Sequence, residues 1–129
     1  MNLHSPRYAL AIAILVCLAV YLLVACAPVR SKPIVLVYEN CQHRAEMVEV
    51  EIMASHAPGI DCVRHAADYG VNPLWFAVQI PVACAMRLAE RALVILPFGA
   101  PVEMVVHELM HAVGYDHPPG LWGPMTCGE

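Results

Sequence analysis

The sequence predicts an α/β domain of the α+β type, because runs with strand character and runs with helix character follow one another along the chain. A compact apolar run at 34–38, rich in valine and isoleucine, predicts a buried strand. Apolar residues at near-helical spacing, separated by glutamates, predict a first helix over 44–55. A second helix is expected to hold Pro101 in its first turn. Its core-facing residues are predicted to be Val102, Val105, Val106, Leu109 and Val113.

The segment between the two predicted helices is expected to supply further strands. A proline–glycine pair at 58–59 predicts the end of the first helix, and a second strand is predicted near 60–64. The run at 75–80 has an alternating apolar character that indicates another strand. The run at 93–96 is the next strand candidate. These features complete the order strand, helix, several strands, helix.

Three histidines and one glutamate lie close together in the last quarter of the sequence. On a helix, His107 and His111 project from one face about one turn apart, with Glu108 beside them. Gly114 can adopt the left-handed conformation that ends a helix and turns the backbone sharply. This turn is expected to bring His117 back towards the first two histidines. The spacing therefore predicts a metal site.

Three imidazoles suit a single zinc ion, Zn2+. Zinc held by three protein nitrogens keeps a fourth position for water, and the ion lowers the pKa of that water towards about 7. A neighbouring carboxylate, here that of Glu108, can then accept the proton. The alternative is a closed structural site in which Cys127 is the fourth ligand and no water binds.

The histidines, the glutamate and the glycine form the pattern H-E-x-x-H-x-x-G-x-x-H, which resembles the signature of the metzincin metallopeptidases. That family also has a methionine turn beneath the metal. Met125 matches this methionine, because it follows His117 by eight residues, a spacing similar to that in the matrixins, one branch of the family. The resemblance is strong over 101–126. It implies that the three histidines bind zinc, that Glu108 is the general base, and that Met125 lies under the metal without binding it.

The resemblance also implies a fold and a mode of substrate binding. The implied fold is zincin-like, a mixed twisted sheet with the first helix and the active-site helix packed on it. In that family, an edge strand before the active-site helix aligns an extended peptide substrate through main-chain hydrogen bonds. Here that strand is expected at 92–96. Because the sequence ends four residues after Met125, the resemblance predicts a truncated C-terminal subdomain.

The N-terminal region is strongly apolar. Residues 8–27 carry no charge and follow Arg7, which resembles a secretory signal, although a run of this length can also span a bilayer. The end of the run, Leu-Val-Ala-Cys at 23–26, resembles the lipobox of bacterial lipoproteins, in which the cysteine, here Cys26, is lipidated and becomes the mature N-terminus. An uncleaved anchor is the alternative. The predicted organisation is a signal peptide or membrane anchor at 1–25, a tether at 26–33 and a metzincin-like zinc peptidase domain at 34–129.

The chain contains six cysteines, of which two lie in the apolar run or at its end. The other four are an even number in a small domain, which predicts two disulfides and export to an oxidising compartment. Four cysteines allow three pairings, and the preferred one joins Cys41 to Cys62 and Cys84 to Cys127. Free thiols in the cytosol are the alternative.

Charge and composition restrict the classes of partner that the protein is expected to bind. From residue 26 onward there are six basic and eleven acidic residues and no basic stripe, so no nucleic acid is expected as a partner. A peptide or protein substrate is expected. The protein is also expected to be attached to a membrane through its N-terminal lipid or helix. The leading hypothesis is an exported zinc-dependent endopeptidase, anchored to a membrane of the bacterial cell envelope on its periplasmic or extracellular face. The alternatives are a non-enzymatic exported binding or structural module stabilised by zinc and disulfides, and a hydrolase of cell-wall peptides.

Overall fold

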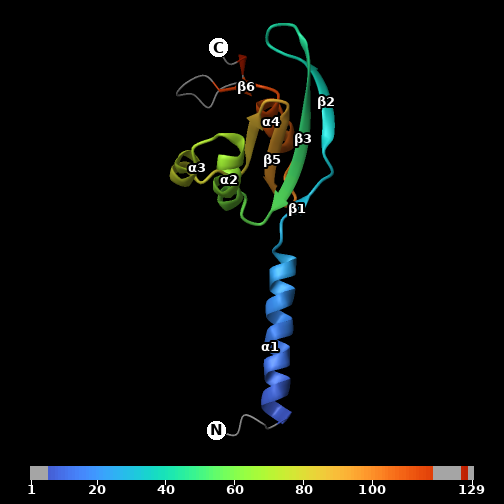
Figure 1. Ribbon diagram of the computed structural model, residues 1–129, viewed down its shortest axis with the longest axis vertical. Coiled ribbons are helices and arrows are strands. Elements are labelled where there is room, and N and C mark those ends of the chain that lie inside the picture. Colours follow the sequence, from blue (N-terminus) through green and yellow to red (C-terminus); the bar gives the residue numbers. More distant parts are fainter. Residues whose placement is uncertain (1–5, 118–125, 128–129) are drawn as a thin grey trace.

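A computed structural model of the chain describes residues 6–117 and 126–127. In this part of the chain, four α-helices accompany a mixed five-stranded sheet and a two-stranded one, which is an α+β arrangement (Figure 1). The elements in chain order are α1 (Pro6–Ala25), β1 (Val29–Arg30), β2 (Ile34–Glu39), β3 (Ala45–Ser55), α2 (Pro58–Ala66), the 3-10 helix η1 (Ala67–Tyr69), α3 (Pro73–Gln79), β4 (Cys84–Leu88), β5 (Arg91–Pro97), α4 (Val102–Ala112), β6 (Tyr115–Asp116) and β7 (Thr126–Cys127).

The larger sheet has β3 and β5 at its centre. Its strand order is β1-β3-β5-β4, and β2 pairs with the same side of β3 as β1 does. β3 and β5 run parallel, whereas the other pairs in this sheet are antiparallel. Within the described residues, β4 pairs only with β5. β4 therefore forms one edge of the sheet, and β1 and β2 form the other.

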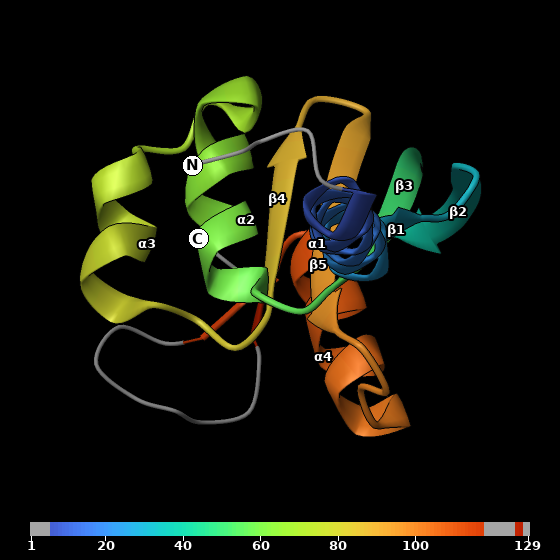
Figure 2. The same cartoon turned by 90° about the horizontal axis from the view of Figure 1, so that it is seen from below.

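Helices cover both faces of this sheet (Figure 2). α2 and α3 lie on one face, over a core that includes Met53, Phe76 and Ile95. α4 lies on the other face, over a core that includes Val50 and Val94. Because it is covered on both sides, β5 is buried along almost its whole length, which explains the continuous apolar run that predicted a strand at 93–96. That prediction is confirmed.

The helix predicted over 44–55 is wrong, because this segment is strand β3. Val48, Val50 and Ile52 recur at every second position and pack towards the α4 face. The spacing of Val48 and Ile52 also fits a helix, which made the pattern ambiguous. Pairing with β2 on one side and β5 on the other decides in favour of the strand.

Two predicted strands are helices. The segment 60–64 lies inside α2, and Pro58 is in the first turn of this helix instead of ending an earlier one. The segment 75–80 falls mainly in α3, where the side chain of Asn72 caps the first turn by accepting a hydrogen bond from the amide of Leu74 at 3.0 Å. Short apolar runs of this kind do not distinguish strand from helix by their periodicity.

The strand at 34–38 and the helix that follows Pro101 are confirmed, with two corrections. β2 is not buried, because it lies at the edge of the sheet with its outer side exposed. In α4, Met104, Val105 and Leu109 pack towards the core. Two residues predicted to face the core are instead exposed, namely Val102 (73%) and Val106 (50%).

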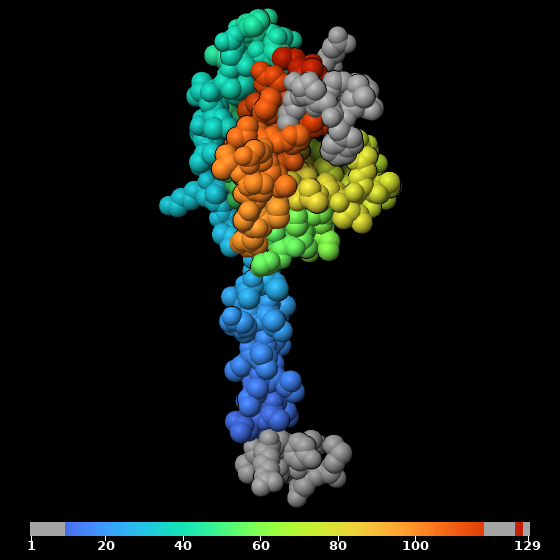
Figure 3. Space-filling model, turned by 180° about the vertical axis from the view of Figure 1, so that it is seen from behind, coloured from blue at the N-terminus to red at the C-terminus, as the bar shows by residue number. Residues whose placement is uncertain are grey.

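Helix α1 extends away from the rest of the structure (Figures 1 and 3). Its side chains from Leu10 onward are exposed, and Cys26 directly after it is also exposed. The backbone oxygen of Ala25 lies 3.2 Å from Nε2 of His56 at the base of the domain. Among the residues that the structure describes, no helix meets the length and hydropathy required to cross a membrane. The predicted division of the chain at residues 25 and 33 stays a prediction.

Candidate metal centre

The end of α4 places the first part of the candidate site. His107, Glu108 and His111 lie in the last two turns of this helix, which is at the surface in Figure 3. The backbone then reverses at Gly114, whose φ of +96° is a conformation that only glycine adopts without strain. The amide of Gly114 donates to the carbonyl of His111 at 3.0 Å and so closes the last turn. The chain returns through β6 to His117.

The reversal brings the three imidazoles together. Their candidate ligand nitrogens all lie within 4.8 Å of one another, and each pair of ring centroids is 5.0 Å apart. Nε2 of His107 and Nε2 of His117 are 3.2 Å apart. Two nitrogens bound to one tetrahedral zinc ion at about 2.05 Å lie about 3.3 Å apart. The spacing and the chemistry of these donors therefore fit a zinc ion.

The backbone of β6 orients one of the three rings. Nδ1 of His111 lies 2.9 Å from the carbonyl oxygen of Tyr115, an acceptor that requires the proton to be on Nδ1. Nε2 of His111 is then the nitrogen with a lone pair for a metal. Asp116 supports the same loop, because its carboxylate accepts the amide hydrogen of His117 at 2.7 Å and lies 3.9 Å from Nδ1 of His111.

Burial and mutual repulsion affect the charges of the site. Burial lowers the pKa of His107, and the neighbouring His111 and His117 lower it further, which favours the neutral imidazole that binds metals. Glu108 is buried, with 8% of its surface exposed. This burial raises the pKa of Glu108 to about 7, against a smaller opposite effect of His117.

The cysteines pair differently from the prediction. Disulfides join Cys41 to Cys127 and Cys62 to Cys84, so the predicted pairing of Cys41 with Cys62 and of Cys84 with Cys127 is wrong. Because 60–64 belongs to α2, Cys62 faces the sheet next to the start of β4, where Cys84 lies. The bond to Cys41 also removes the thiolate that the closed four-ligand alternative required of Cys127.

Of the other predicted features of the site, one is wrong and one is not tested by the structure. The predicted edge strand at 92–96 is wrong, because β5 has a neighbour on each side and the edge strand next to it is β4. Met125, the predicted methionine under the metal, lies outside the described residues.

The short ladder that supports the third histidine was not predicted from the sequence. β6 pairs antiparallel with β7, so that Tyr115 lies opposite Cys127 and Asp116 opposite Thr126. Strands of two residues give almost no sequence signal, and this pairing depends on a contact between segments that are distant in the chain. A local signal did exist at Asn40, which begins a polar stretch between two apolar runs and is typical of a hairpin turn.

Comparison with known proteins finds no similarity: no protein-family model matches the chain, and no curated protein or solved structure matches it significantly.

Proposed function

We propose that this protein is a zinc-dependent endopeptidase of the metzincin type. The observation that carries the proposal is the triangle of imidazoles formed by His107, His111 and His117, because its spacing suits a tetrahedral ion with one further position. The position of Glu108 directly after the first histidine supports a hydrolytic role over a purely structural one.

Each residue of the site would have a separate role in the reaction. His107, His111 and His117 would hold the zinc, which supplies a Lewis acid and a water of lowered pKa when it is bound. Glu108 would accept the proton of the attacking water and donate it to the leaving amine. The carbonyl of Tyr115 would keep the ring of His111 in the tautomer and orientation that ligation needs.

Strand β4 is the proposed substrate-binding edge. It lies antiparallel to β5 at the border of the sheet, and α4, which carries His107 and His111, packs against both strands. An extended peptide would pair by strand addition with the side of β4 that has no strand partner among the described residues, with its scissile bond above the metal. On the basis of this arrangement we propose that the fold is zincin-like.

The two disulfides fit an oxidising, exported environment. We further propose that Cys26, exposed at the end of α1, is the lipidated residue and that the protein is held at a membrane of the cell envelope. Labelling with a radioactive fatty acid tests this assignment, because Cys26→Ser should abolish the label. Label retained on the variant would contradict it.

Replacing Glu108 with Gln tests the catalytic proposal. The full-length protein, kept in a mild detergent, is incubated with a degenerate library of peptides and cell-wall peptides. Wild-type protein should cleave in a chelator-sensitive way, and Glu108→Gln should bind zinc with turnover reduced at least about 100-fold, the usual contribution of a general base. Glu103→Gln is the matched control, because Glu103 is exposed in the first turn of the same helix.

The same experiment separates the remaining alternatives. Cleavage confined to cell-wall peptides would favour a cell-wall peptide hydrolase. The two disulfides also favour a second candidate, a zinc-stabilised binding or structural module without activity. Zinc binding without chelator-sensitive cleavage of any peptide would support that module and contradict the endopeptidase.

A further inference from the structure

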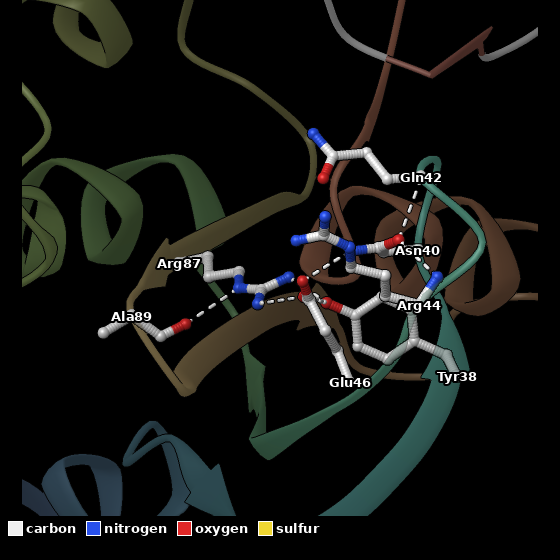
Figure 4. Close-up of polar contacts among 7 residues, drawn as sticks. All are labelled: Tyr38, Asn40, Gln42, Arg44, Glu46, Arg87 and Ala89. Carbon is white, nitrogen blue, oxygen red and sulfur yellow. Dashed lines mark hydrogen bonds and ion pairs between the residues drawn. The ribbon is translucent and has the colours of Figure 1, made fainter.

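The tip of the β2–β3 hairpin is held in a fixed shape by one asparagine. The side-chain oxygen of Asn40 accepts hydrogen bonds from the amides of Gln42 and Arg44, both at 2.9 Å. The amide of Asn40 donates to the carbonyl of Arg44 at 2.9 Å (Figure 4). Cys41 lies inside this loop. The loop therefore presents its cysteine from a defined position.

A polar cluster fixes the loop end of the same hairpin to the edge strand β4. Tyr38 donates to the carboxylate of Glu46 at 2.7 Å, and the guanidinium of Arg87 contacts both the hydroxyl of Tyr38 and the carboxylate of Glu46 (Figure 4). Arg87 also donates to the carbonyl of Ala89 at 2.9 Å. The hairpin is thus anchored across the sheet to the strand that we propose binds substrate.

The disulfide connects this anchored hairpin to the metal centre. Cys41 is bonded to Cys127 in β7, and Cys127 lies opposite Tyr115 in the β6–β7 ladder. The carbonyl of Tyr115 accepts the hydrogen bond from His111, and His117 follows β6 directly. Two of the three candidate ligands therefore depend on a strand whose pairing partner is held by the disulfide.

The ladder is too short to hold its position unaided. Among the described residues it consists of two residue pairs, and an isolated two-stranded pairing is marginal in water even when it is longer. On its other side β6 is joined to α4 through Gly114, the residue type with the most backbone freedom. A covalent bond to a fixed hairpin removes the freedom that the ladder and the glycine leave.

We propose that the Cys41–Cys127 disulfide is a positioning element of the metal centre, which keeps β6 where His117 and His111 converge on His107. This inference rests on the proposed zinc function. The Cys62–Cys84 disulfide has no such role, because it joins α2 to β4 within the core on the opposite face of the sheet.

The second disulfide provides a matched control. Zinc affinity is measured for the full-length protein by competition with a chromophoric chelator, in the wild type, Cys41→Ala/Cys127→Ala and Cys62→Ala/Cys84→Ala. The first variant should lose about 10- to 100-fold in affinity, the usual effect of removing support around a metal ligand. The second should stay within about threefold of the wild type, below that range. Equal losses, or no loss in the first variant, would overturn the inference.

The zinc affinities also distinguish a failure of the proposed function from a failure of the positioning role. If the wild type binds no zinc, both the function and the inference fall. If the wild type and both variants bind zinc equally well, the proposed zinc site stands and the positioning role alone is refuted. Absorption spectra of the Co2+-loaded proteins add a second readout, because a displaced imidazole alters the tetrahedral d–d bands, whereas a change in overall stability does not.

Limited reduction repeats the test without any substitution, in case the first variant does not fold. Cys127 is exposed, whereas Cys62 and Cys84 are 0% and 5% exposed, so a water-soluble phosphine should reduce the Cys41–Cys127 bond first. The phosphine becomes its oxide with oxygen from water, and the two sulfurs become thiols. These thiols are blocked with iodoacetamide, so that neither replaces a ligand. Unchanged zinc affinity after verified selective reduction would also overturn the inference.

A double-mutant cycle tests whether the effect passes through the third ligand. In the His117→Ala background, removing Cys41 and Cys127 should cost much less zinc affinity than in the wild type, because the ligand they position is already absent. A loss of equal size in both backgrounds would indicate general destabilisation instead of positioning and would refute the mechanism.

Discussion

The two faces of the central sheet have similar apolar cores and differ in the structure that adjoins each core. Both carry a core of buried aliphatic side chains from β3 and β5 beneath a helical layer. The α2–α3 face is closed by the buried Cys62–Cys84 disulfide, which joins elements that are already in contact. The α4 face continues past its helix into a short loop that carries a candidate metal ligand.

This difference separates the residues that stabilise the whole domain from those that position the candidate metal ligands. On the α2–α3 face, a change in packing should alter the stability of the whole domain and leave the imidazoles in place. On the α4 face, none of the residues 114–117 is buried, and this loop relies on a glycine turn, the β6–β7 ladder and a disulfide. Changes there should alter zinc affinity beyond their effect on stability.

The largest expected effect on stability comes from the disulfides. By the loss of chain entropy in the unfolded state, removing Cys41–Cys127, which spans 86 residues, should lower the free energy of unfolding by about 4.5 kcal/mol. Removing Cys62–Cys84, which spans 22 residues, should cost about 3.4 kcal/mol. The cavity left by the two buried sulfurs adds to the second value. Urea unfolding without zinc, using the Cys→Ala pairs, measures both.

Combined with the zinc affinities, these values test the contrast between the faces. The two variants should have similar stabilities and different affinities. If the zinc affinity instead followed the free energy of unfolding in both variants, the two faces would not be separate in function.

The same contrast explains which features the sequence predicted. The motif from His107 to His117 was interpretable because its spacing and its glycine determine a local geometry, a helix end followed by a reversal. The strand at 93–96 was recognised because burial on both faces leaves a continuous apolar run. Local patterns sufficed where local chain geometry decides the structure.

Features that depend on distant contacts were not predicted correctly. The segment 44–55 satisfies both the helical and the strand period at Val48 and Ile52, and its parallel pairing with β5 decides between them. The partner of Cys41 depends on where the chain returns 86 residues later. Neither fact is contained in a short window of sequence, so both had to come from the structure.

Gly114→Ala, matched with Gly99→Ala, sharpens the comparison with a smaller perturbation. Both glycines have positive φ, +96° and +71°, and nothing lies within 4 Å of a Cβ built at Gly99. Each substitution should cost about 1–2 kcal/mol of stability through backbone strain. Only Gly114→Ala should also weaken zinc binding, because its strain is relieved by moving the loop that carries His117. Competition with a chelator measures the difference, and equal affinities would contradict the role assigned to the turn.

The smallest effects are expected from replacing two asparagines, each of which accepts backbone hydrogen bonds through its side chain. They lie in different parts of the molecule. Asn72 caps α3 through the amide of Leu74, and Asn40 caps the hairpin loop through two amides. Replacing either with Ala should cost about 1 kcal/mol in the free energy of unfolding. Asn72→Ala should leave zinc affinity unchanged, because α3 packs on α2, away from the metal loop. Asn40→Ala should lower it by less than removal of the disulfide does, since the bond to Cys127 remains. A weaker zinc affinity in Asn72→Ala than in Asn40→Ala would show that the two faces are coupled.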